Sequence, residues 1–171
     1  MRVLGIDPGF ATTGYGVVER AGGSLRPVVF GAVRTPPALP QAARLAYLRR
    51  ALLEIVRGSR PDVVAIERLF FNANVRTAMS VGQASGVALA AVAEAGLDVV
   101  DYTPPEVKQS VVGVGNASKR QVQAMVAALL KLPVIPKPPD AADACALAIC
   151  HLNRNGLARA IATVKSREAA G

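Results

Sequence analysis

Two short apolar runs of this chain each end in an acidic residue. The first run, Val3–Ile6, meets Asp7 and then breaks at Pro8-Gly9. The second run is the apolar part of an expected strand over Asp62–Ile66, and it meets Glu67. Apolar runs of this length that are bounded by turn residues are typical of buried strands. Ligands of α/β proteins usually bind at the carboxyl ends of such strands. If the two strands are parallel neighbours in one sheet, both carboxylates reach the same edge.

A pair of acids further along the chain adds to this pattern. Asp140 and Asp143 open the last expected helix, and residues three apart lie on one helical face. Each acid also has an ordinary structural explanation, since Asp7 can bond the amides of its turn and the helical pair can serve capping. Taken together, four clustered carboxylates repel one another unless cations are present. Their oxygen atoms suit Mg²⁺ or Mn²⁺, whereas zinc is disfavoured because His151 is the only histidine.

The charge balance indicates an anionic partner. The chain carries 20 Lys and Arg residues against 12 Asp and Glu residues, a formal charge of +8. Such an excess makes a polyanion the first partner to consider, although it can also serve solubility alone. There is no apolar run long enough for a membrane span and no signal-peptide pattern. We therefore expect a cytoplasmic protein, without a membrane partner, whose Cys145 and Cys150 are reduced core residues.

The remaining pattern predicts a hairpin followed by alternating helices and strands. Further strands are expected over Gly14–Arg20, Leu25–Arg34 and Leu97–Tyr102. Helices are expected over Gln41–Arg57, Val75–Ala95, Ser118–Leu132 and Asp140–Asn153. Breaks are expected at Thr35–Pro40, Thr103–Pro105 and Pro133–Pro139. This order indicates a single α/β domain with a mixed sheet flanked by helices. The small residues of the second helix fit either a dimer face or burial against the sheet.

The segments with chemical character resemble a known family. They are, in chain order, Gly5–Gly16, Ile66-Glu67 with Phe70, Val107–Gln109, Ser118-Lys119 and Asp140–Ile149. In this order they resemble the RuvC family of bacterial Holliday junction resolvases, and the similarity runs from Met1 to about Leu152. The resemblance implies an RNase H-like mixed five-stranded sheet in one nuclease domain over residues 1–155. The tail over residues 156–171 carries no family motif and is expected to be frayed.

The resemblance also implies roles for individual residues. Asp7, Glu67, Asp140 and Asp143 match the family's metal-binding catalytic acids. Further residues are candidate DNA contacts, namely Phe70, Phe71, Asn74, Arg76, Lys108, Lys119 and Arg120. Phe70 matches an aromatic that stacks on an unpaired base, a contact worth about 1–3 kcal/mol, and Lys108 and Lys119 match lysines near the scissile phosphate. Seen in isolation, the phenylalanines could equally anchor a loop and the lysines could be solvated.

The implied activity is the resolution of four-way DNA junctions by paired symmetric nicks that leave 5′-phosphate and 3′-hydroxyl ends. It would use Mg²⁺, with Mn²⁺ as a substitute, and two ions about 4 Å apart can activate a water and stabilise the leaving oxygen. The implied partners are a second copy of the chain and the RuvA–RuvB branch-migration proteins.

Three other classes stay open at this point. They are an RNase H-like nuclease that trims ribosomal RNA precursors, an actin-like ATPase or sugar kinase, and a catalytically silent junction-binding module. The ATPase and kinase class needs two lobes, which 171 residues do not supply.

Overall fold

A five-stranded mixed sheet forms the centre of the computed structural model, which describes residues 1–68 and 75–168, with side chains described for residues 1–68 and 78–156. The strands are β1 (Arg2–Asp7), β2 (Thr12–Ala21), β3 (Ser24–Arg34), β4 (Val63–Glu67) and β5 (Val99–Tyr102). They lie in the order β3-β2-β1-β4-β5. The β3-β2-β1 part is antiparallel, and β1, β4 and β5 run parallel. The predicted mixed sheet is therefore confirmed.

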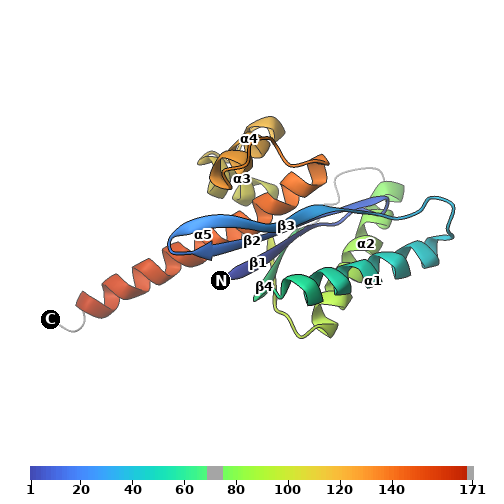
Figure 1. Ribbon diagram of the computed structural model, residues 1–171, viewed down its shortest axis with the longest axis horizontal. Coiled ribbons are helices and arrows are strands. Elements are labelled where there is room, and N and C mark those ends of the chain that lie inside the picture. Colours follow the sequence, from blue (N-terminus) through green and yellow to red (C-terminus); the bar gives the residue numbers. More distant parts are fainter. Residues whose placement is uncertain (69–74, 169–171) are drawn as a thin grey trace.

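Helices cover both faces of this sheet (Figure 1). They are α1 (Gln41–Ser59), α2 (Val75–Glu94), α3 (Pro104–Val112), α4 (Lys119–Leu129) and α5 (Pro139–Glu168). The α1 and α2 helices pack together on one face, whereas α5 crosses the other face against β1 and β2. The α3 and α4 helices pack on the outer side of α5. None of the helices in the described ranges is long and apolar enough to cross a membrane.

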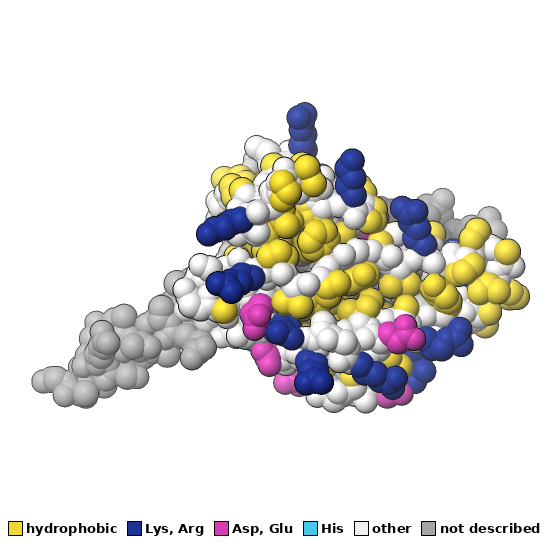
Figure 2. Space-filling model, in the orientation of Figure 1, with side chains coloured by type: hydrophobic (Ala, Val, Ile, Leu, Met, Phe, Trp, Pro, Cys, Tyr) yellow, Lys and Arg dark blue, Asp and Glu magenta, His cyan; other side chains and the backbone are white. Residues whose placement is uncertain are grey.

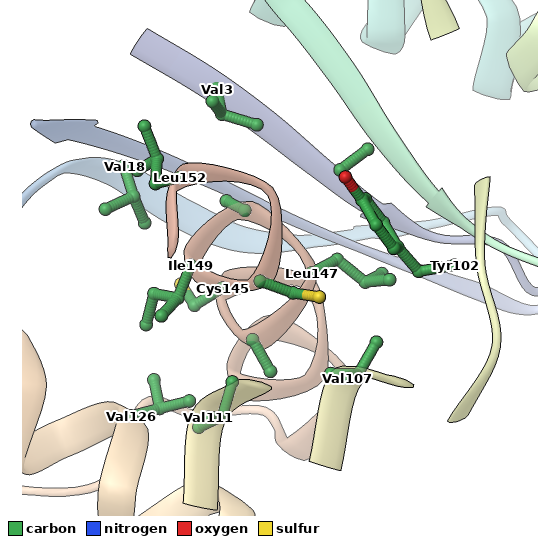
Figure 3. Packing of buried hydrophobic residues seen from close by; sticks show 14 of the residues in the cluster. Val3, Val18, Tyr102, Val107, Val111, Val126, Cys145, Leu147, Ile149 and Leu152 are labelled. Atoms are coloured by element: carbon green, nitrogen blue, oxygen red, sulfur yellow. The ribbon is translucent and has the colours of Figure 1, made fainter. Parts of the chain in front are cut away.

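A separate hydrophobic cluster fills each side of the sheet. Large aliphatic residues, including Leu4, Ile6, Leu48 and Leu52, pack between the sheet and the α1–α2 pair. On the other side, α5 lies between the sheet and the α3–α4 pair, and its Ile149 and Leu147 belong to the cluster drawn in Figure 3. The alternation along each strand decides which residues enter which cluster.

The second cluster holds one buried polar pair and both cysteines. The Tyr102 hydroxyl lies 2.8 Å from Nδ1 of His151, and burial lowers the pKa of this histidine. Cys145 and Cys150 are buried and free, as expected. His151 is thus a core residue, which agrees with its exclusion as a zinc ligand.

Glycines allow α5 to lie unusually close to the sheet. A methyl group built on Gly5 of β1 would lie 1.9 Å from the carbonyl oxygen of Ala144, and one built on Gly16 of β2 would lie 2.5 Å from Sγ of Cys145. Gly5 and Gly16 are directly paired across β1 and β2. The backbone of α5 therefore rests on strand backbone that carries no side chains at these points.

Two sequence predictions are wrong in this part of the fold. Thr103–Pro105 does not break the chain but starts α3, because Thr103 is an N-cap and its capping box with Glu106 is complete. Both prolines lie in the first helical turn, where their missing N–H groups cost nothing. The last helix also continues to Glu168 and does not end near Asn153. The expectation of a frayed tail stays a prediction.

The structure tests one of the two alternatives for the small residues of α2, namely their burial against the sheet. Ala84, Ala88 and Ala91 are buried in the cluster that α2 shares with α1 and the sheet, so burial is confirmed for this side of the helix. Met79 and Leu89 are exposed on the same helix. A dimer face on α2 stays a prediction.

Candidate active site

Two of the predicted acids end neighbouring parallel strands. Ile6 of β1 is paired with Ile66 of β4, so that Asp7 and Glu67 follow at equivalent positions. Because side chains alternate along a strand, both acids point away from the α1–α2 cluster that holds the two isoleucines. Both carboxylates therefore reach the same edge and the same face of the sheet, which is the face covered by α5.

The first turn of α5 brings the other two acids to this edge. Gly14 of β2 is paired with Asp7, and a methyl group on Gly14 would lie 2.1 Å from the carbonyl oxygen of Asp140. Asp143 follows one turn later and lines the same cavity as Asp7 and Glu67. We call Asp7, Glu67, Asp140 and Asp143 the acidic site. Its members come from three elements that are distant in the sequence.

The acids are close enough for their charges to affect the ionisation of Asp7 and Glu67. Burial, followed by the charges of Glu67, Asp143 and Asp140, raises the pKa of Asp7 to about 7. Burial and the charge of Asp143 also raise the pKa of Glu67. In both cases nearby Lys119 acts in the opposite direction. This clustering means that full ionisation of the acidic site requires positive charge.

Lys119 supplies part of that positive charge in the structure. This residue lies at the start of α4, and its Nζ is 2.5 Å from Oδ2 of Asp143. The hydrogen bond with Asp143 and the charges of Asp143, Asp7 and Asp140 raise the pKa of Lys119, against the effect of its desolvation. The lysine therefore places a positive charge beside the acids.

A cavity of about 410 Å³ opens in front of the acidic site. Its polar wall contains Lys108 and Lys119 beside the acids. Its apolar wall is formed by Pro104, Val107, Val122, Ala146 and Leu147. The cavity thus has acidic groups, two lysines and an apolar wall, and it is open to a substrate.

The donor set fits a hard divalent cation. All four members offer carboxylate oxygens, the ligand type that Mg²⁺ and Mn²⁺ prefer. Over the described ranges, no three acidic, histidine or cysteine side chains converge closely enough to hold an ion without other ligands. Mg²⁺ normally keeps several waters and takes only one or two carboxylates together with substrate phosphate. The acidic site and a phosphate would therefore share the coordination of an ion.

The predicted DNA contacts are placed unevenly. Lys108 and Lys119 line the cavity, and Arg120 is exposed beside Lys119 at the start of α4. Phe70, Phe71 and Asn74 lie outside the described residues. Arg76 lies in the first turn of α2, and its side chain is likewise outside the described part.

Sequence reasoning missed two contributions to this site. One is the apolar wall supplied by Pro104 and Val107, because the paired prolines predict a break where α3 begins. The capping box formed by Thr103 and Glu106 was the signal that could have found it. The other is Gly14, whose contact with Asp140 joins positions far apart in the chain.

Solved structures with distant sequences define the class of fold. The yeast mitochondrial Holliday junction resolvase Ydc2 has a TM-score of 0.62 at 14% identity, covering 88% of this chain and 78% of that one. The fowlpox virus resolvase, solved with Holliday junction DNA, has a TM-score of 0.57 at 12% identity, covering 87% of this chain and 97% of that one. Together with the strand order, these likenesses show an RNase H-like fold, here with carboxylates at the strand ends.

Closer relatives define the family. The family described as crossover junction endodeoxyribonuclease RuvC matches residues 3–151, so this chain belongs to the RuvC family. The crossover junction endodeoxyribonuclease RuvC of Chloroflexus aggregans is 56% identical over 151 residues, covering 88% of this chain and 92% of the relative. A structure of Thermus thermophilus RuvC has a TM-score of 0.84 at 37% identity, covering 92% of this chain and 97% of that one. A second structure holds T. thermophilus RuvC in complex with Holliday junction substrate, with a TM-score of 0.84 at 35% identity over 92% of this chain and 96% of that one.

Proposed function

We propose that this chain is a divalent-metal-dependent endonuclease that resolves four-way DNA junctions by paired symmetric nicks during homologous recombination and repair. Relatives over most of its length are crossover junction endodeoxyribonucleases, and a related RuvC has been solved with a Holliday junction substrate. The observation that carries the proposal is that Asp7, Glu67 and Asp143 line one open cavity together with Lys108 and Lys119. Carboxylates and cations at the edge of an RNase H-like sheet suit phosphodiester hydrolysis.

The four acids are the catalytic metal ligands in this proposal. Two Mg²⁺ ions per site, replaceable by Mn²⁺, would supply an activated water and stabilise the leaving oxygen. The chain's own part is to hold four carboxylates together at one edge of the sheet. Burial, followed by the charges of the other three acids, raises the pKa of Asp7, which supports the assignment. Lys119 pairs with Asp143 in the ion-free site. With metal and substrate bound, Lys108 and Lys119 would neutralise the scissile phosphate. The products carry 5′-phosphate and 3′-hydroxyl ends.

The DNA-binding surface extends from the cavity over α3 and α4. In the face shown by Figure 2, the charged side chains visible over these helices are Lys and Arg. Residues 104–138 contain Lys108, Lys119, Arg120, Lys131 and Lys137 against Glu106 alone. We assign Lys108, Lys119 and Arg120 to phosphate contacts, and we propose the same role for Asn74 and Arg76. Phe70 stacks on an unpaired base beside the cut, and Phe71 is adjacent to it.

A four-way junction has two equivalent strands, so paired nicks call for two active sites related by two-fold symmetry. We therefore propose a homodimer, and the exposed Met79 and Leu89 of α2 are available for its interface. By family membership we also propose cooperation with the RuvA–RuvB complex and action in the cytoplasm.

The decisive test uses a synthetic four-way junction with Mg²⁺ or Mn²⁺. We expect the parent protein to make paired symmetric nicks and Asp7→Asn to lose at least about 10³-fold in cleavage rate, since one metal ligand is gone. Both should bind the junction. Asp98→Asn is the matched control, because it makes the same charge change at an exposed position in the connection that precedes β5.

Other outcomes decide between the alternatives. A parent that binds the junction but never cuts it with either ion would be a binding module. A parent that cuts single-stranded RNA and ignores junctions would belong with the nucleases of ribosomal RNA processing. Equal cleavage by the parent and Asp7→Asn would remove Asp7 from the metal site.

A further inference from the structure

Gly14 lies beside the acidic site, although it has no side chain to contribute. It is the residue of β2 directly opposite Asp7 of β1. Opposite residues of an antiparallel pair point to the same face of the sheet. A side chain at position 14 would therefore point toward α5, as the carboxylate of Asp7 does.

The space that such a side chain would need is taken by the first turn of α5. A methyl group on Gly14 would lie 2.1 Å from the carbonyl oxygen, 2.5 Å from the carbonyl carbon and 2.9 Å from Cβ of Asp140. Contacts under 3.0 Å are essentially never seen for real Cβ atoms. Two of the three contacts involve backbone atoms, so rotation of the Asp140 side chain cannot relieve them. The helix itself would have to move away from β2.

We propose that Gly14 is a positioning residue, whose bare backbone sets the distance between Asp140 and Asp7. This inference rests on the proposed metal site. Gly14 is paired with Asp7 and packs against the backbone of Asp140, so it lies where these two residues approach each other. A methyl group at this position would push Asp140 away from the strand pair that carries Asp7. The lack of a side chain at position 14 thus allows Asp140 to lie close enough to Asp7 to share a metal ion.

The two common hard cations respond differently to such a gap. Mg²⁺ demands nearly ideal octahedral geometry with short ligand distances, whereas Ca²⁺ tolerates irregular shells and longer distances. A displaced Asp140 should therefore weaken Mg²⁺ binding more than Ca²⁺ binding. A general loss of folding would weaken both equally, so the ratio of the two affinities reports on position.

The test measures Mg²⁺ and Ca²⁺ binding to the full chain by isothermal titration calorimetry at pH 8 without DNA. Gly14→Ala should weaken Mg²⁺ binding at least about tenfold, as supporting residues of metal sites typically do, with a smaller loss for Ca²⁺. Adding Asp140→Glu should restore part of the Mg²⁺ affinity, because the longer side chain spans the gap. In the parent, Asp140→Glu should itself weaken Mg²⁺ binding, since no gap is present.

Gly16→Ala is the matched control. It lies on the same face of β2 and meets the same helix at Cys145, where a methyl group would lie 2.5 Å from Sγ and 2.8 Å from the backbone nitrogen. It therefore crowds the same helix more than one turn beyond Asp140, and its effect on Mg²⁺ affinity should be smaller than that of Gly14→Ala. Equal losses of Mg²⁺ affinity in Gly14→Ala and Gly16→Ala, or no rescue by Asp140→Glu, would overturn the role of Gly14. If Gly14→Ala does not fold, unchanged Mg²⁺ affinity of Asp140→Glu in the parent overturns it. If Asp140→Asn leaves Mg²⁺ binding unchanged, the metal site itself fails and the role of Gly14 with it.

Discussion

The two faces of the central sheet are packed in different ways. On the α1–α2 face, large side chains such as Leu4, Leu48 and Leu52 are fully buried and fill the space between the elements. On the α5 face, Gly5 and Gly16 leave the strand backbone bare, and the helix backbone approaches it directly. The acidic site lies on this second face.

The two kinds of packing suit different roles, namely stability on the α1–α2 face and positioning of the acidic site on the α5 face. Burial of large aliphatic side chains supplies stability, and such packing tolerates small shifts of a helix. A metal site needs its ligands held closely, and backbone resting on backbone leaves little freedom for a shift. We therefore expect changes on the α1–α2 face to alter stability alone, and changes on the α5 face to alter the geometry of the site as well.

The largest expected effect on stability comes from the α1–α2 face. Leu52→Ala removes a fully buried side chain of α1 and leaves a cavity, which should cost about 2–5 kcal/mol of unfolding free energy. Cleavage per folded molecule should stay unchanged. Urea unfolding and junction cleavage at low temperature measure the two quantities, with Arg50→Ala, at an exposed position of the same helix, as the control. A drop in cleavage beyond the unfolded fraction would show that the two faces are not independent.

Unlike the buried side chain of Leu52, the carboxylate of Asp7 should lower the stability of the folded chain when it is ionised. The pKa of Asp7 is raised from 3.8 to about 7, so the folded chain keeps a proton that the unfolded chain has already lost between these values. Stability without divalent ions should therefore fall as the pH rises from about 4 to 7, by as much as about 4 kcal/mol, and then level off.

Asp7→Asn should remove this pH-dependent loss of stability, because asparagine does not ionise. Without divalent ions, the variant should be more stable than the parent at pH 8, and the two should converge near pH 4. Urea unfolding in the presence of a chelator measures the difference. Added Mg²⁺ should stabilise the parent more than the variant, because only the parent retains all of its ligands. Parallel pH profiles would mean that burial and the neighbouring acids do not raise the pKa of Asp7.

Local patterns carried most of what the sequence could predict. The apolar runs that end in Asp7 and Glu67 predicted two strand ends at one edge, and the pairing of Ile6 with Ile66 confirms this arrangement. The capping box at Ser118 correctly predicted the start of α4. Such signals lie within a few residues of each other, so they need no knowledge of tertiary structure.

Long-range contacts were beyond the reach of these patterns. The ion pair of Lys119 with Asp143 and the contact of Gly14 with Asp140 depend on how α4, α5 and β2 pack, which no local spacing encodes. The prediction of a break at the start of α3 was wrong for a different reason. Paired prolines favour a break in general, and only the cap formed by Thr103 and Glu106 makes them compatible with a helical first turn.

The smallest expected effect compares the same substitution on the two faces. Gly58 lies in the last turn of α1, where a methyl group would meet nothing within 4 Å. Because alanine restricts the unfolded chain and favours helix, Gly58→Ala should raise the unfolding free energy by up to about 1 kcal/mol. Gly16→Ala on the α5 face should lower it, since the methyl group would lie 2.8 Å from the backbone nitrogen of Cys145. Thermal unfolding of both variants under identical conditions measures the two signs. Changes of opposite sign in the unfolding free energy would mean that the glycines of the α5 face allow the helix to approach the sheet closely. A loss of stability in both variants would mean that these glycines have no such special role.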